Sequence, residues 1–350
     1  MSSGIKKYFA AANTFYGFKS IFDEIFKRDA YEKVYVIKGG PGTGKSSLMK
    51  KFSSYFAYKE CQVEEIYCSS DPNSLDGVII EKNGRRIAML DGTAPHQTDS
   101  VLPGVCDEII DLANGLDKRI LGAQREKVLM LLDEKKKCYN SAYNYLAIAG
   151  KSEEIICSLY SSNFLKEKAY FAAESILKDI PLKFAGITKH IFLSSFGKAG
   201  FKKSEDNLSN FERKIKVSGD KIQSLIFITF LANTLSIKNA NHTVLPYPLD
   251  PDFCEGILIP DESTAIIYDE SGEINSKEYF DLCRADEEKI KKARQLKKDA
   301  LDEAVRWFSV ASDMHFRLEE IYGSAMNYEY NDEIFAKKTI EIENILENTI

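Results

Sequence analysis

The sequence predicts an α/β fold in two similar halves, each with a parallel β-sheet flanked by helices and with a helical extension. Three observations lead to this class. A β-branched run at Val34–Ile37 precedes a glycine-rich loop and then apolar residues at helical spacing. Short motifs of the first half recur in order in the second half. Long charged stretches with few glycines or prolines close both halves, which is typical of helices.

The expected strands of the first half come at three places. One ends at Lys38, a second covers about Gln62–Cys68, and a third covers about Arg86–Asp91. All three are short, rich in β-branched or apolar residues, and bounded by polar or glycine-containing segments.

The length of the chain and the proline and glycine residues that interrupt it near its middle predict two units. A chain of 350 residues is long for one domain. We place a first unit at residues 1–185, with a helical extension over about 104–180. A second unit covers residues 186–350, with a C-terminal helical extension over about 276–350.

The evidence for duplication is a set of separated matches. Three blocks agree in order, namely Lys6–Ala12 with Lys189–Ser195, Asp71–Ile80 with Asp250–Ile259, and Ala88–Asp91 with Ile266–Asp269. A weaker match pairs Asn144–Ala149 with Arg306–Ala311. Repeated units of this kind are expected to pack as an intramolecular pseudo-dimer.

Residues Gly39–Ser46 carry the strongest signal for function. They read Gly-Gly-Pro-Gly-Thr-Gly-Lys-Ser, a complete phosphate-binding loop between a strand and a helix. The glycines let backbone N–H groups surround phosphate oxygens, and Lys45 reaches the β- and γ-phosphates. No Asn-Lys-x-Asp motif follows, so ATP is expected rather than GTP. The residues expected to contact the nucleotide are Gly39, Gly40, Pro41, Gly42, Thr43, Gly44, Lys45, Ser46 and Ser47.

Asp91 ends the apolar run Ile87–Leu90 and is the candidate magnesium ligand, together with the hydroxyl of Ser46. An aspartate at this place can also simply form a turn with Gly92. His96 leaves the same edge of the sheet, where it is either a general acid or base or a solvated loop residue. The candidate catalytic set is therefore Lys45, Asp91 and His96.

Two departures from an ordinary ATPase are visible. Many ATPases of this class carry a water-activating glutamate directly after the strand-ending aspartate, where this chain has Gly92. The segment Lys216–Ser224 occupies the place of a second phosphate loop but lacks the glycine run and the Gly-Lys-Ser ending. We therefore expect one nucleotide site, in the first half.

Composition excludes several other classes. A net charge of −6 argues against a nucleic-acid partner. The seven cysteines form no C-x-x-C pair, and the four histidines are scattered, which predicts reduced thiols in a cytoplasmic protein without a zinc site. The apolar run Leu225–Leu231 is too short to span a bilayer and is expected in the core.

The chain resembles a family of uncharacterised bacterial P-loop ATPases with an internal duplication. The likeness rests on the phosphate loop with Lys38, on Cys68–Pro72, on Asp76–Ile80 and on Asp91–His96. It covers nearly the whole chain, and the pieces outside the phosphate loop are the more specific ones. Members can carry a phosphate loop in both halves, so this chain departs in its second half.

The resemblance implies binding of ATP and Mg²⁺ but no substrate. From the sequence, hydrolysis coupled to a conformational change or to an unidentified protein or small-molecule partner is the first hypothesis. A small-molecule or nucleotide kinase is an alternative, because phosphoryl transfer to an acceptor does not need the missing glutamate. A nucleotide sensor without catalysis is the third.

Overall fold

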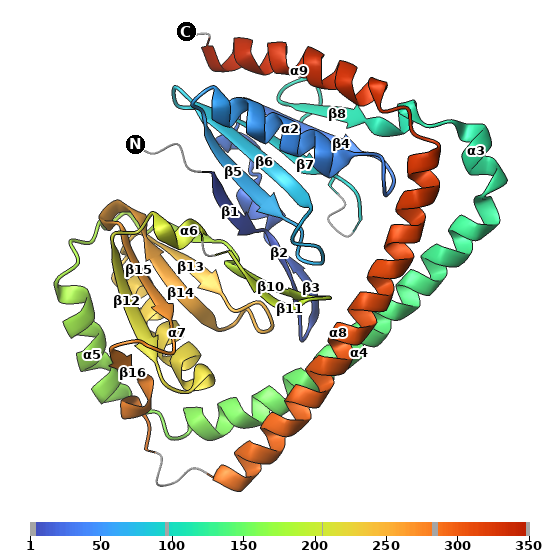
Figure 1. Ribbon diagram of the computed structural model, residues 1–350. Helices are drawn as coiled ribbons and strands as arrows, with labels where there is room; N and C mark the ends of the chain where they lie inside the picture. The colour runs from blue at the N-terminus through green and yellow to red at the C-terminus, as the bar shows by residue number, and fades with distance from the viewer. Residues whose placement is uncertain (1–4, 95–97, 205, 282–285, 348–350) are drawn as a thin grey trace.

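The computed structural model describes residues 5–94, 98–204, 206–281 and 286–347. Two α/β units lie beside each other, and two long helices connect them along one side of the molecule (Figure 1). This arrangement confirms the α/β class and the internal duplication.

The first unit is built on a six-stranded mixed sheet in the order β1-β5-β6-β7-β4-β8. Its strands are β1 (Lys6–Phe9), β5 (Gln62–Tyr67), β6 (Leu75–Lys82), β7 (Arg85–Asp91), β4 (Lys33–Lys38) and β8 (Asp107–Asp111). β6 runs antiparallel to both neighbours, and the remaining pairs are parallel. Helices α2 (Lys45–Tyr58) and α9 (Glu329–Glu347) share a hydrophobic core on one face of this sheet. Helix α1 (Phe22–Ile25) belongs to a second cluster with other residues of the same strands.

The second unit repeats this topology. Its sheet has the order β16-β12-β15-β14-β13-β9, which matches the first sheet strand for strand when read in reverse. The strands are β9 (Thr188–His190), β12 (Arg213–Ser218), β13 (His242–Pro246), β14 (Cys254–Ile259), β15 (Thr264–Tyr268) and β16 (Ile274–Asn275). Helix α7 (Lys221–Ile237) takes the place of α2, and the run Leu225–Leu231 is largely buried within it, as expected for core.

The sheets differ from expectation in two respects. They are mixed rather than wholly parallel, because the chain returns from β5 through a short turn and a short turn allows only an antiparallel neighbour. β8 lies inside the stretch that was expected to be helical from about residue 104. Its five residues are too few to show a period, and pairing with β4 decides their conformation.

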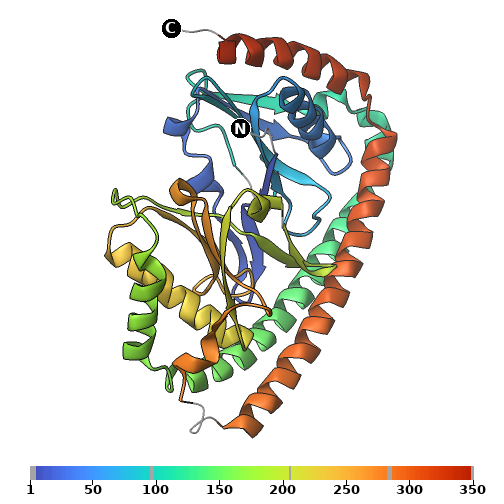
Figure 2. The ribbon, with the colours of Figure 1, turned by 60° about the vertical axis from the view of Figure 1, so that its left-hand side comes forward.

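Two long helices cross from one unit to the other. α4 (Arg125–Ser161) and α8 (Glu287–Ser324) lie antiparallel, so that Lys135 meets His315 near one end and Glu153 meets Lys297 towards the other. Figure 2 shows the pair running the length of the molecule. Small side chains such as Ala142 and Ala304 are fully buried near its centre, where they allow the two backbones to approach closely.

The helices at the ends of this pair are exchanged between the units. α5 (Lys166–Lys178), which follows α4, packs against α7 of the second unit. α9, which follows α8, packs against α2 of the first unit. The hairpin of β2 (Ala11–Thr14) and β3 (Gly17–Ser20) also contacts its counterpart, β10 (Ser194–Gly197) and β11 (Gly200–Lys203). Each unit is thus completed by elements from the other half of the sequence.

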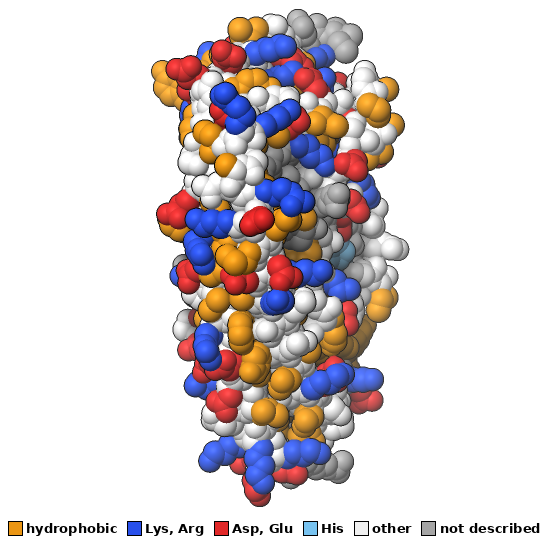
Figure 3. All heavy atoms as spheres, turned by 90° about the vertical axis from the view of Figure 1, so that its right-hand side faces the viewer, with side chains coloured by type: hydrophobic (Ala, Val, Ile, Leu, Met, Phe, Trp, Pro, Cys, Tyr) orange, Lys and Arg blue, Asp and Glu red, His pale blue; other side chains and the backbone are white. Residues whose placement is uncertain are grey.

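The outer face of the helix pair carries charges of both signs along its length (Figure 3). Several are paired one turn apart, as in Lys137–Asp133 and Lys298–Asp302. In the part of the chain that the structure describes, no helix has the length and apolar character needed to cross a membrane.

Candidate functional site

The glycine-rich loop connects the end of β4 with the start of α2. β4 lies between β7 and β8 inside the first sheet. Gly42 and Gly44 have φ angles of 72° and 87°, which glycine adopts without strain. Gly44 is the N-cap of α2 and leaves the first turn without a side-chain cap. The unpaired N–H groups and the helix dipole make this end attractive to an anion.

Lys45 lies within the loop. Its ammonium donates hydrogen bonds to the carbonyl oxygens of Gly39 and Gly40, at 2.8 and 3.1 Å. The same nitrogen is 3.7 Å from Oδ2 of Asp91. The structure therefore brings together the loop lysine and the strand-ending aspartate that the sequence singled out.

Asp91 also forms the turn that was the alternative interpretation. Its Oδ1 accepts hydrogen bonds from the backbone N–H and the hydroxyl of Thr93, at 2.8 and 2.6 Å. The two interpretations are compatible, because one carboxylate oxygen belongs to the turn and the other is directed to Lys45. Ser46 accepts a hydrogen bond from the N–H of Leu75 at 2.9 Å. His96 falls outside the described residues.

The corner between α8 and α9 packs directly on the phosphate loop. A Cβ atom at Gly40 would lie 2.5 Å from the ring of Tyr322, and one at Gly42 would lie 2.5 Å from the backbone oxygen of Glu319. Tyr328 donates to the carbonyl of Gly42 at 2.8 Å. Asn331 donates to the carbonyl of Thr43 at 2.9 Å. Glycine is thus required here for close packing against the second half of the chain.

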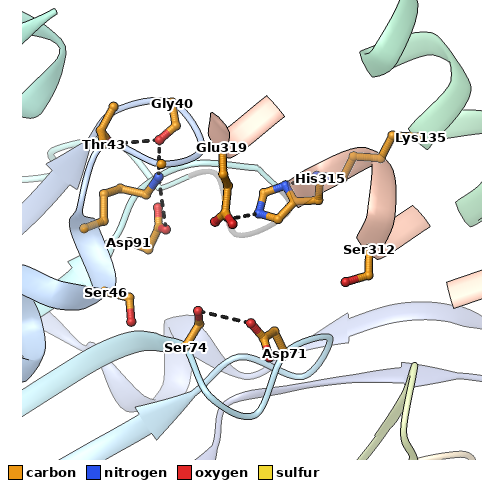
Figure 4. A network of polar contacts seen from close by, with 12 residues as sticks. Gly40, Thr43, Ser46, Asp71, Ser74, Asp91, Lys135, Ser312, His315 and Glu319 are labelled. Carbon is orange, nitrogen blue, oxygen red and sulfur yellow. Dashed lines mark hydrogen bonds and ion pairs between the residues drawn. The ribbon is translucent and has the colours of Figure 1, made fainter. Parts of the chain in front are cut away.

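Helix α8 also brings a polar network to the site (Figure 4). Lys135 of α4 lies 2.9 Å from Nδ1 of His315, and Nε2 of His315 lies 3.5 Å from Oε1 of Glu319. Burial, together with the nearby charges of Lys135 and Lys45, lowers the pKa of His315 to about 4. The ring is therefore neutral near pH 7. Because an ammonium can only donate, Nδ1 is the acceptor and Nε2 carries the proton that faces Glu319.

Glu319 is the acidic group that reaches the site from the second half. Burial raises the pKa of its carboxyl, and nearby Asp71 raises it further, whereas Lys45, Lys135 and Lys198 act in the opposite direction. A carboxylate with a raised pKa beside a phosphate loop is suited to accepting a proton. Sequence reasoning missed Glu319, because only the antiparallel register of α4 and α8 places it there.

A further basic group comes from the β10–β11 hairpin. Lys198 donates to the hydroxyl of Ser312 at 3.0 Å and lies 3.7 Å from Asp71. Asp71 accepts from the N–H of Asn73 at 3.3 Å and from the hydroxyl of Ser74 at 3.4 Å. Asp71 thus stabilises its own turn, and its carboxylate also lies near Lys198 of the hairpin.

The equivalent loop of the second unit has a different construction. Only Gly219 and Asp220 separate β12 from α7. The carboxylate of Asp220 accepts hydrogen bonds from the N–H groups of Ile222 and Gln223, at 3.1 and 3.4 Å, and also binds Arg294. The Asp220 side chain therefore caps the N-terminus of α7, whereas the corresponding N-terminus of α2 has no side-chain cap.

The residues present can accommodate a magnesium ion. Among the described residues, no group of three His, Cys, Asp or Glu side chains could hold a metal by itself. Mg²⁺ bound with a nucleotide does not need such a group, because one or two protein ligands, phosphate oxygens and waters complete its shell. The carboxylate of Asp91 and the hydroxyl of Ser46 supply ligands of the right kind.

Comparisons of this chain with protein-family models, with curated proteins and with solved structures found no match.

Proposed function

We propose that the first half of this protein binds Mg·ATP and hydrolyses it, and that hydrolysis acts on the α8–α9 corner or on a partner. The observation that carries the proposal is the position of Lys45. Its ammonium sits inside a glycine loop at the uncapped start of α2, 3.7 Å from Asp91. This combination of cation, open helix end and carboxylate suits a polyphosphate with its metal.

Ser46 and Asp91 would hold the magnesium ion, which neutralises charge that develops on the phosphates. Lys45 would stabilise the same charge from within the loop. These residues would position the metal and stabilise the charge on the phosphates. None of them is a free base, since Asp91 accepts hydrogen bonds from Thr93 and faces Lys45.

Glu319 is our candidate for the group that activates water. It lies on the corner that covers the loop, and its raised pKa makes it a better base than an ordinary surface carboxylate. Its neighbour His315, neutral and held by Lys135, presents Nε2 to the carboxylate at 3.5 Å. The second half would thus supply the water-activating carboxylate that this chain lacks at Gly92.

The same corner provides a route for coupling. Tyr328 and Asn331 bind loop carbonyls directly, and α8 continues along α4 to the second unit. A change in loop conformation on hydrolysis would therefore act on a helix that spans both halves.

A kinase is supported by a different observation. Lys135 and Ser312 lie opposite the phosphate loop (Figure 4), and Lys198 donates to Ser312, so that these groups could hold an anionic acceptor. A sensor would use the same site without turnover.

Phosphate release with Mg·ATP alone, compared with release and ADP formation in the presence of an acceptor panel, separates these functions. Phosphate release without acceptor supports hydrolysis. ADP formed only with an acceptor supports a kinase, and no turnover with tight binding supports a sensor.

A further inference from the structure

A pocket of about 450 Å³ lies in the second unit, between the start of α7, the helix pair and the β10–β11 hairpin. Because α7 corresponds to α2, this pocket is next to the place that the phosphate loop occupies in the first unit. Its walls are largely apolar and include Phe196, Leu225, Leu301 and Val305.

The charged residues around the pocket pair with one another, apart from one. Glu153 pairs with Lys297, Asp220 with Arg294, and Asp302 with Lys298. The remaining charged side chain of the lining is Lys221, the first residue of α7, as Lys45 is the first residue of α2.

The ammonium of Lys221 makes no hydrogen bond or salt bridge with any residue that the structure describes. Its ammonium lies over the rings of Phe201 and Tyr247, 4.4 and 4.7 Å from their centroids. The two rings are stacked, with centroids 6.0 Å apart and planes inclined by 18°. The ring faces stabilise the positive charge. They do not accept hydrogen bonds from the three N–H groups as an anion would.

Nearby Glu255 does not form a salt bridge with the ammonium of Lys221. Its carboxyl accepts a hydrogen bond from the hydroxyl of Ser194 at 2.6 Å, and burial raises its pKa. Burial lowers the pKa of Lys221, and Glu255 only partly opposes this effect. An anion brought to the ammonium by a ligand would therefore be stabilised at a poorly hydrated place.

We propose that this pocket binds a small planar monoanion, such as an aryl carboxylate, whose ring rests on the apolar wall while its charge pairs with Lys221. The aromatic residues Phe196, Phe201 and Tyr247 suit a planar body. A polyphosphate is disfavoured, because Asp220 already caps α7 and adds negative charge where phosphates would lie. This site is independent of nucleotide binding in the first half.

The test is calorimetric titration of the full chain with 2-naphthoate, using neutral 2-naphthalenemethanol as the matched probe. Wild type should prefer the carboxylate. Lys221→Met keeps the aliphatic stem and should reduce affinity for 2-naphthoate about tenfold or more, with little effect on the alcohol. Lys221→Arg should retain binding of the carboxylate. Val305→Trp fills the pocket and should weaken binding of both probes.

Lys45→Met is the matched control, because it removes the equivalent lysine of the first unit and should leave affinity for 2-naphthoate unchanged. Circular dichroism establishes that each variant is folded. The proposal is wrong if wild type does not bind 2-naphthoate at millimolar concentration, or binds the alcohol equally well. It is also wrong if Lys221→Met retains full affinity, or if Mg·ATP displaces the probe.

Discussion

Lys297 of α8 pairs with the buried carboxylate of Glu153 on α4, at the position where the other end of the helix pair has Lys135 and His315. Each of the two cross-helix contacts thus contains a lysine, Lys135 or Lys297, but the residue that faces the lysine differs between them. In the second unit the partner is an acid, and the contact is a closed ion pair. In the first unit it is a neutral imidazole, which leaves its other nitrogen for Glu319. The same helix register therefore gives a structural contact at one end and a polar network beside the phosphate loop at the other.

Lys297→Met should destabilise the fold strongly. The Glu153 side chain is only 2% exposed, so the substitution leaves a buried carboxylate without its partner. Removing one member of such a pair costs about 3–5 kcal/mol. Chemical denaturation measures the loss, and adding Glu153→Leu should restore most of it. Lys298→Met removes an exposed pair one residue away and should cost less than about 1 kcal/mol. Equal effects of the two lysine substitutions would contradict the importance of burial.

Lys45→Ala should lower the affinity for Mg·ATP tenfold or more while the chain stays folded. A hydrogen bond to a charged group is worth about 1.5–3 kcal/mol, and this lysine is already inside the loop. Isothermal titration calorimetry measures the change. Lys221→Ala, at the equivalent helix start, serves as the control and should bind Mg·ATP as wild type does. Unchanged affinity in Lys45→Ala would refute the assignment.

Asp91→Asn should reduce turnover much more than nucleotide affinity. The amide keeps the hydrogen bonds of the turn with Thr93 but loses the charge that faces Lys45 and the metal. Metal placement contributes several kcal/mol to stabilising the transition state, so a loss of about a hundredfold or more in turnover is expected. The measurement is phosphate release at saturating Mg·ATP, with affinity measured separately. Wild-type turnover would exclude Asp91 as a magnesium ligand.

Glu319→Gln should reduce hydrolysis about 10²–10⁴-fold without weakening nucleotide binding, as expected for loss of a general base. The raised pKa of Glu319 adds a pH signature. The carboxylate must be ionised to accept a proton, so turnover should fall as the pH drops through a pKa above the usual 4.5. Glu320→Gln changes an exposed neighbour and is the matched control. If Glu319→Gln keeps wild-type turnover and the same acid limb, another group activates water.

The sequence was sufficient for the local parts of this structure. The strand, glycine loop and helix around Lys45 are contiguous, and the separated matches revealed the duplication that the two sheets confirm. The weaker match of Asn144–Ala149 with Arg306–Ala311 also fits, since each segment lies in the long helix of its half. β8 was missed because five residues beside an established strand carry too little periodic signal.

The contributions of the second half to the first site could not be predicted from the sequence. Glu319, Tyr322 and Lys198 are far from the loop along the chain, and no local motif marks them. The positions of Glu319 and Tyr322 depend on the antiparallel register of α4 with α8, and that of Lys198 depends on the contact of its hairpin with the first half. A repeat pattern reveals that two units exist, but it does not tell which elements they exchange.

One ATP should bind per chain, in the first half. The loop that begins the second unit's helix is too short to surround phosphate oxygens, and Asp220 occupies the N–H groups that a phosphate would need. Its carboxylate also repels negative charge, whereas Gly44 leaves the start of α2 open. Equilibrium titration with Mg·ATP at known protein concentration gives the stoichiometry. Wild type should show one site, and Lys45→Ala should weaken that site. Two equivalent sites in wild type, or a tight site that survives in Lys45→Ala, would place a nucleotide in the second unit and contradict this account of Asp220.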